Sequence, residues 1–270
     1  MILTIDTGGT KTLFASFSSD GIIKKQIKLP TPKDQGDYIK LLIKTIDNEF
    51  NFEPIEAISI ALPGIFVGNI AVWCNNLGWK DFDIIKHLSD YTGDIPLFVQ
   101  NDANLAGLAE ARMINPLPKS SLYVTISTGI GTGYISNGKI DSELSSSEGG
   151  HMLLEFEGKL QEWEKFASGS SIVTKFGKYA RDINDDQTWN QIIERISKGF
   201  FAIIPLTQPE IIIIGGSIGT HFEKYGHKLQ MLIKSQLPSH IPCPQFIQAA
   251  HPEEAVVYGC YYYAIDCMSS

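Results

Sequence analysis

The chain has 270 residues, of which 43% are hydrophobic and 19% are charged, a profile typical of a globular protein with one large or two moderate domains. The formal net charge of −8 disfavours binding to the phosphate backbone of nucleic acids. The apolar runs are shorter than the roughly 18–20 residues of a membrane span, and the N-terminus lacks the features of a signal peptide. We therefore expect a cytoplasmic protein that binds neither nucleic acid nor membrane.

Predicted strands and helices alternate along the first half of the chain. Apolar or alternating runs predict strands at residues 2–6, 12–17, 22–29, 55–62 and 95–100. Apolar residues at helical spacing predict helices at residues 37–50, 82–92 and 102–113. This alternation is typical of a layered α/β fold.

The segment "INPLPKSS" (114–121) is the expected domain boundary, because it contains prolines and has no periodicity. Beyond it we expect strands at 122–127, 132–136, 210–216 and 244–250, a mostly helical region at 158–204, and helices at 217–237 and 252–265. Pro252, followed by Glu253 and Glu254, suits the start of the last helix. We assign residues 1–116 and the C-terminal helix 252–270 to one domain and residues 117–251 to the other.

Similar glycine turns occur in the two halves, in "LTIDTGGTKT" (3–12) and "VTISTGIGTG" (124–133). Glycine lets backbone N–H groups approach an anion, and hydroxyl donors are added by Thr7, Thr10, Thr128 and Thr132. The candidate phosphate ligands are Gly8, Gly9, Thr10 and Lys11 in the first turn, and Thr128, Gly129 and Gly131 in the second. Two ordinary β-hairpins remain the alternative interpretation.

Asp6 ends the first predicted strand, where a lone buried carboxylate would be costly. A role as a ligand of Mg²⁺, through water and together with nucleotide phosphates, would explain it.

A third glycine turn follows the apolar strand "EIIIIGG" (210–216). The carboxyl ends of strands are where open α/β sheets bind ligands, so Gly215, Gly216 and Ser217 are candidates for contact with an adenosine. A tight strand-to-helix turn is the structural alternative.

Asp102 lies where a predicted strand gives way to a helix in "FVQNDANLAGLAEAR" (98–112). A carboxylate at this place, flanked by Asn101 and Asn104, suits a general base for phosphoryl transfer. It equally suits an N-cap of the helix, and the residues alone do not separate these two roles.

Glu148 and His151 in "SSSEGGHMLLE" (145–155) offer directed hydrogen bonds to a polyhydroxylated ligand, although a lone histidine is more often structural. The segment "NNLGWKDF" (75–82) adds amides and an aromatic side chain beside a turn.

Together these motifs resemble the ROK family, which contains sugar kinases, related repressors and N-acetylmannosamine kinases. The resemblance covers nearly the whole chain and follows the family order of motifs. The motifs are "IDTGGTKT", "NNLGW", "VQNDANLAGLAEAR", "TISTGIGTGYISNGKI", "EGGH" and "IIIIGGSI". The resemblance implies two actin-like, ribonuclease-H-like α/β domains facing a cleft.

The same resemblance implies roles for individual residues. Asp102 would be the catalytic base, and Asp6 would lie near Mg²⁺. The sugar would be bound by Asn76, Asn101, Asp102, Glu148, His151 and Glu164. Glu162 is a weaker claimant to the role of Glu164.

One departure concerns zinc. Family members often have a zinc site of the E-x-G-H histidine and three closely spaced cysteines, whereas residues 152–164 contain no cysteine. We therefore expect no zinc site. The four cysteines, Cys74, Cys243, Cys260 and Cys267, are scattered and fit free thiols.

The resulting prediction is a homodimeric kinase that uses ATP and Mg²⁺ to phosphorylate the 6-hydroxyl of a hexose such as glucose or N-acetylmannosamine. A glucokinase that uses polyphosphate is one alternative. A sugar-sensing regulator is another, but the chain begins at the phosphate strand and leaves no room for a helix-turn-helix. A non-catalytic sugar-binding protein is disfavoured by the presence of Asp6, Asp102 and both turns.

Overall fold

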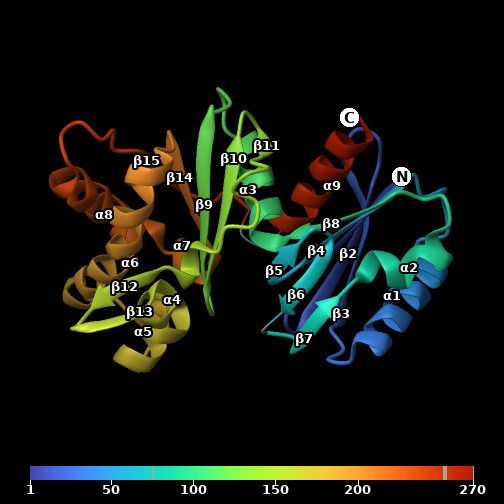
Figure 1. Cartoon of the computed structure of the whole chain (residues 1–270), viewed down its shortest axis with the longest axis horizontal. Helices are drawn as coiled ribbons and strands as arrows, with labels where there is room; N and C mark the ends of the chain where they lie inside the picture. The colour runs from blue at the N-terminus through green and yellow to red at the C-terminus, as the bar shows by residue number, and fades with distance from the viewer. Residues whose placement is uncertain (75, 252–253, 270) are drawn as a thin grey trace. The chain divides into compact units, whose positions relative to one another are not determined.

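The computed structural model describes residues 1–74, 76–251 and 254–269, and runs of strands are interspersed with helices in both halves of the chain (Figure 1). The chain divides into two compact units, Met1–Ala109 with Glu253–Ser270, and Glu110–Pro252. This division falls inside helix α3 (Asp102–Arg112), and the domain boundary at 116/117 stays a prediction. The predicted helix start at Pro252 and Glu253 lies outside the described residues.

The first unit is built on a five-stranded sheet with the order β3-β2-β1-β4-β8. Its strands are β1 (Ile2–Thr7), β2 (Lys11–Phe17), β3 (Ile23–Pro30), β4 (Ala57–Leu62) and β8 (Leu97–Asn101). The first three form an antiparallel meander, whereas β4 pairs in parallel with both β1 and β8. Because β1, β4 and β8 are parallel, Asp6 of β1 and Asn101 of β8 come to the same edge of the sheet.

Helices cover both faces of this sheet (Figure 1). Helices α1 (Gln35–Glu49) and α2 (Ile84–Thr92) lie on one face, and α9 (Ala255–Met268) lies on the other. The side chains of β1 alternate accordingly, with Leu3 and Ile5 in the core under α1 and Ile2 in the core under α9. The period-2 geometry of a strand thus explains why both kinds of position are apolar.

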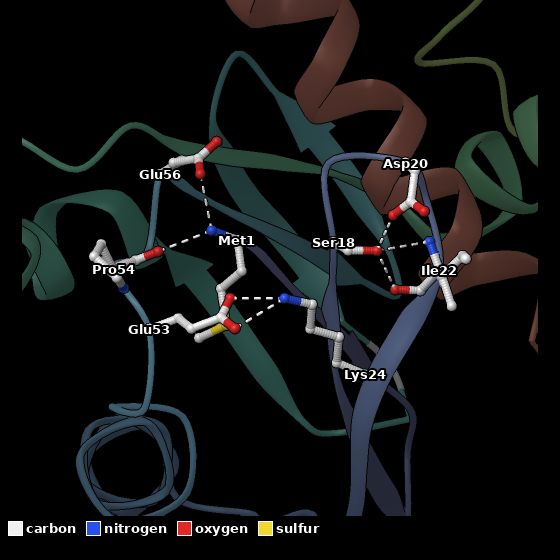
Figure 2. Close-up of polar contacts among 8 residues, drawn as sticks. All are labelled: Met1, Ser18, Asp20, Ile22, Lys24, Glu53, Pro54 and Glu56. Atoms are coloured by element: carbon white, nitrogen blue, oxygen red, sulfur yellow. Dashed lines mark hydrogen bonds and ion pairs between the residues drawn. The ribbon is translucent and has the colours of Figure 1, made fainter.

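The opposite edge of the same sheet is held by polar contacts (Figure 2). The Met1 ammonium group donates to the Pro54 carbonyl at 2.8 Å and to Glu56 Oε1 at 3.0 Å. Lys24 pairs with Glu53 at 2.9 Å across the neighbouring loop. These contacts fix the amino end of β1, so the strand presents Asp6 at its other end.

A small antiparallel sheet follows β4 and was not predicted. It consists of β5 (Ile65–Val67), β6 (Ile70–Cys74) and β7 (Trp79–Phe82). The Trp79 side chain is buried, packs against Tyr38 in a tilted arrangement with 4.8 Å between ring centroids, and donates to the Lys33 carbonyl. The aromatic side chain predicted beside this turn is therefore part of the core.

The second unit repeats the strand order and directions of the first, with the order β11-β10-β9-β14-β15. Its strands are β9 (Ser120–Ile126), β10 (Ile130–Ser136), β11 (Lys139–Ile140), β14 (Ile211–Gly215) and β15 (Gln245–Gln248). Helices α6 (Asp186–Thr207) and α8 (Phe222–Gln236) contribute Phe200 and Leu229 to its core. The expectation of two similar α/β units is confirmed.

Two predicted helical stretches of the second unit are wrong in part. Residues 159–162 form β13 (Lys159–Glu162), which pairs with β12 (Leu153–Phe156) in a hairpin. Glu157 and Gly158 have φ values of 51° and 74°, as in the two-residue turns that close hairpins. The stretch 217–237 is divided into α7 (Gly216–Gly219) and α8. Shorter helices complete the region, namely α4 (Trp163–Ala167) and α5 (Gly169–Phe176), with 3₁₀ turns at Gly149–His151 and Ala180–Asp182.

All four cysteines are free, which confirms the expectation from their scatter. Cys74 and Cys260 are buried, whereas Cys243 and Cys267 are partly exposed. Among the described residues, no helix combines the length and the apolar character that crossing a membrane requires.

Candidate functional site

Two acids lie at the carboxyl edge of the first sheet. Asp6 is in β1, and Asp102 is the first residue of α3, directly after β8. Burial raises the pKa of Asp102 to about 6, while the hydrogen bond from the Ala103 N–H opposes this shift. Burial also raises the pKa of Asp6 to about 7, the charge of Asp102 adds to the rise, and Lys28 opposes it. The two carboxylates therefore share a site in which negative charge is poorly compensated.

Asn101 is the principal cap of helix α3. Its Oδ1 accepts from the N–H groups of Ala103 at 2.8 Å and Asn104 at 3.3 Å, and its Nδ2 donates to the Gly64 carbonyl at 2.9 Å. Asp102 Oδ1 accepts from the N–H of the next residue, Ala103, at 2.9 Å. The capping role left open for Asp102 thus falls mainly to Asn101, whose predicted contact with a substrate stays a prediction.

The first glycine turn follows Asp6 and is held by its neighbours. The Gly8 N–H donates to the Lys11 carbonyl at 2.9 Å, and Lys33 donates to the Gly9 carbonyl at 2.8 Å. A Cβ added at Gly9 would lie 3.1 Å from Cβ of Asn76, so the structure brings Asn76 against this turn. Thr10 and Lys11 are exposed.

The second and third glycine turns meet in the second unit. The Ser127 N–H donates to the Gly129 carbonyl at 2.9 Å, and the Ser217 N–H donates to Ser127 Oγ at 2.9 Å. Gly216 has a φ of 76°, and a Cβ there would lie 2.6 Å from the Ile126 carbonyl oxygen. Glycine is therefore required where the third turn approaches the second. The other predicted glycines have different places: Gly131 pairs with Thr125 inside the ladder of β10 and β9, and Gly215 ends β14.

A cavity of about 600 Å³ opens beside these turns. Its lining combines small polar groups with apolar and aromatic ones: Ser127, Thr128, Gly169, Ser170, Val173, Tyr179, Ala180, Arg181, Ser217, Ile218, Thr220 and His221. Of these, only Thr128 and Ser217 had been predicted from the sequence. The pattern "ASGSS" (167–171) could have indicated the cavity residues of α5. Ser168 caps this helix, and the start of the helix lines the cavity.

The segment 148–151 packs directly on strand β10. A Cβ at Gly150 would lie 2.0 Å from the Ile130 carbonyl oxygen, and one at Gly149 would lie 2.6 Å from Cγ2 of Thr132. The two glycines therefore allow Glu148 and His151 to lie beside the second turn.

Two of the predicted phosphate-binding hydroxyls are already used inside the protein. Thr132 is buried, and its Oγ1 accepts from the Gly149 N–H at 3.1 Å. Thr7 is buried too, and its hydroxyl bonds the Tyr38 hydroxyl at 2.5 Å. These two threonines are therefore structural, and the prediction was wrong for them.

Glu162 and Glu164 both lie close to His151. The distance from His151 Nδ1 to Glu162 Oε2 is 3.4 Å, and one ligand atom of each of the three residues lies within 4.8 Å of the others. Glu164 Oε2 also accepts from the Ile130 N–H at 3.4 Å, which joins it to the second turn. From the sequence, the two glutamates were alternative candidates for one sugar-binding role, whereas the structure places both beside His151.

Comparison with known proteins gives consistent relatives. The fructokinase of Pediococcus pentosaceus is 28% identical over 233 residues, covering 79% of each chain. The N-acetylmannosamine kinase of Escherichia coli O139:H28 is 29% identical over 247 residues, covering 80% of this chain and 83% of that one.

Solved structures match over nearly the full length. A ROK family protein of Streptococcus pneumoniae in complex with sucrose has a TM-score of 0.84 at 24% identity, covering 99% of each chain. A ROK family glucokinase of Streptomyces griseus in complex with glucose and AMPPNP has a TM-score of 0.80 at 19% identity, covering 98% and 99%. These matches confirm the actin-like α/β fold. The profile of the ROK family matches residues 2–266, and the chain therefore belongs to the ROK family.

Proposed function

We propose that this chain is a sugar kinase that transfers the γ-phosphoryl group of ATP to the 6-hydroxyl of a hexose of the glucose or N-acetylmannosamine type. The observation that carries the proposal is the carboxylate of Asp102, held at the start of α3 with its pKa raised to about 6. A general base works best when its pKa lies near the operating pH. In this role Asp102 accepts the proton of the sugar hydroxyl as that oxygen attacks the phosphoryl group.

Asp6 is the proposed partner of Mg²⁺, through water. Carboxylate oxygen is a ligand that Mg²⁺ prefers, and the pKa of about 7 at Asp6 reflects burial and the charge of Asp102. A divalent cation beside Asp6 would stabilise its ionised carboxylate and so offset both the burial and the charge of Asp102. The residues present therefore fit the ion. When bound, it would neutralise charge on the phosphates of the donor.

The cavity of the second unit supports a nucleotide as the phosphoryl donor. Its apolar and aromatic walls, among them Val173, Ile218 and Tyr179, suit the base and ribose of a nucleotide. Polyphosphate has no such group to fill the space. We therefore propose ATP as the donor, with Thr128, Gly129 and the third turn at Gly216 beside it.

The acceptor side of the proposal involves Glu148, His151 and Glu164, which the fold gathers around strand β10. Carboxylates and an imidazole can each make directed hydrogen bonds to the hydroxyl groups of a sugar. The relatives named as kinases act on fructose and N-acetylmannosamine, which supports a sugar acceptor without selecting one.

The test is an ADP-release assay with ATP and Mg²⁺ across glucose, mannose, fructose, N-acetylmannosamine and N-acetylglucosamine, repeated with polyphosphate. We expect ATP-dependent turnover on at least one of these sugars and position-6 phosphate in the product. Asp102→Asn should lower kcat about 10²- to 10⁴-fold. Asp83→Asn is the matched control, because Asp83 caps α2 through its side chain. Absence of sugar-dependent turnover with either donor would contradict the proposal.

A further inference from the structure

Four charged or ionisable side chains form a compact cluster in the second unit: His151, Glu162, Glu164 and Lys165. Lys165 Nζ lies 3.1 Å from Glu164 Oε1 and 3.5 Å from Glu162 Oε2. The same oxygen of Glu162 lies 3.4 Å from His151 Nδ1. The ammonium group thus contacts both carboxylates, and one of them in turn contacts the histidine.

The members of the cluster other than Lys165 are potential ligands of one metal ion, namely His151, Glu162 and Glu164. Their ligand atoms lie within 4.8 Å of one another, and imidazole nitrogen and carboxylate oxygen are both ligands of divalent zinc. The cysteine ligands of a typical family zinc site do not fit here, since Cys243 is the single cysteine in the sequence of the second unit. Cys243 is instead contacted by Gln230.

We propose that the Lys165 ammonium group serves as the cation of this cluster. It occupies the position at which His151, Glu162 and Glu164 would otherwise bind a divalent metal ion. An ammonium group and a metal ion repel each other and compete for the same carboxylate oxygens. Lys165 also orients the carboxylate of Glu164. It holds one oxygen of Glu164 while the other accepts from the Ile130 N–H of the second glycine turn.

The surrounding helix supports this arrangement. Lys165 lies in α4 between Trp163 and Phe166, which are both buried, and Phe166 stacks on Phe156 with 4.4 Å between ring centroids. The frame that carries the lysine is thus anchored on both sides.

The test is a titration of the full-length protein with Co²⁺ and with Zn²⁺, followed by visible absorption and calorimetry. Lys165→Met removes the charge and keeps most of the aliphatic stem. We expect this variant to bind one metal ion per chain at least about tenfold more tightly than the unaltered protein. Adding His151→Ala to Lys165→Met should abolish the gain, and Lys165→Arg should behave as the unaltered protein does.

Lys175→Met is the matched control, because Lys175 is also partly exposed and pairs with a glutamate, Glu157, at 3.6 Å. It should leave metal affinity unchanged. If Lys165→Met does not fold, as judged by circular dichroism, Lys165→Gln takes its place. The proposal is overturned if the unaltered protein already binds a metal ion through His151 as tightly as the variant, or if loss of the lysine brings no gain in affinity. Neither result depends on kinase activity.

Discussion

Asp6 and Asp102, which lie far apart in the sequence, interact as like charges at the carboxyl edge of the first sheet. The charge of Asp102 is the second largest cause, after burial, of the raised pKa of Asp6. Burial is the main cause of the raised pKa of Asp102 itself. Both groups are therefore costly to ionise in the folded chain, and this cost has measurable consequences.

The first consequence is a pH dependence of turnover. If Asp102 is the base, kcat should fall as the pH drops through about 6, because a protonated carboxyl group cannot accept the proton of the sugar hydroxyl. The measurement is kcat against pH at saturating ATP, Mg²⁺ and sugar. A profile that stays flat down to about pH 4, near the unperturbed pKa of an aspartate, would exclude an ionisation of this kind.

The second consequence concerns stability. The pKa of Asp6 is about 7 in the folded chain and about 3.9 when unfolded, so the folded state binds the proton more tightly. Protonation of Asp6 therefore stabilises the folded chain. This stabilisation is complete below about pH 4 and is lost as the pH rises through about 7. Without Mg²⁺ and nucleotide, Asp6→Asn should therefore raise the free energy of unfolding by about 2–4 kcal/mol at pH 8, with a much smaller gain at pH 4.

Urea denaturation at both pH values measures this difference. Asp90→Asn is the control, because Asp90 is an exposed aspartate on α2. An equal gain at pH 4 and pH 8 would show that the effect of Asp6→Asn does not come from ionisation.

The two five-stranded sheets and the glycine turns could be predicted from local sequence. The run "IIIIGG" is β-branched and ends in two glycines, which predicts a buried strand that ends in a turn, and β14 confirms it. The hairpin of β12 and β13 was missed because its strands are short and partly exposed. The pair Glu157 and Gly158, now seen at positive φ, was the local signal for the turn between them.

The parts of the site that were missed depend on contacts between distant segments. Nothing near Thr132 in the sequence shows that its hydroxyl is used by Gly149, and Thr7 is bonded by Tyr38 of another element. Similarly, Tyr179 and Arg181 reach the cavity from a 3₁₀ turn that carries no recognisable motif. Residue type indicates which chemistry is available, but only packing decides whether a polar group is already satisfied.

Gly150 should be intolerant of a side chain. A Cβ there would lie 2.0 Å from the Ile130 carbonyl oxygen, so Gly150→Ala should displace segment 148–151 and lower the free energy of unfolding by about 1–3 kcal/mol. Gly158→Ala is the matched control, because Gly158 has a positive φ but open space around it, and it should cost about 1 kcal/mol. Urea denaturation compares the two. Equal losses would show that strand β10 accommodates the extra methyl group.

Glu164 should matter more than Glu162 for binding of the sugar. The Glu164 side chain is 17% exposed and contacts the second turn through the Ile130 N–H, whereas Glu162 is 34% exposed and contacts His151; both glutamates pair with Lys165. Loss of one hydrogen bond to a charged group costs about 1.5–3 kcal/mol, so Glu164→Gln should raise the KM for sugar about ten- to a hundredfold with little change in the KM for ATP. Glu162→Gln should raise it less than about fivefold. Steady-state kinetics with the preferred sugar decide the order, and a larger effect from Glu162 would move the sugar contact to that residue.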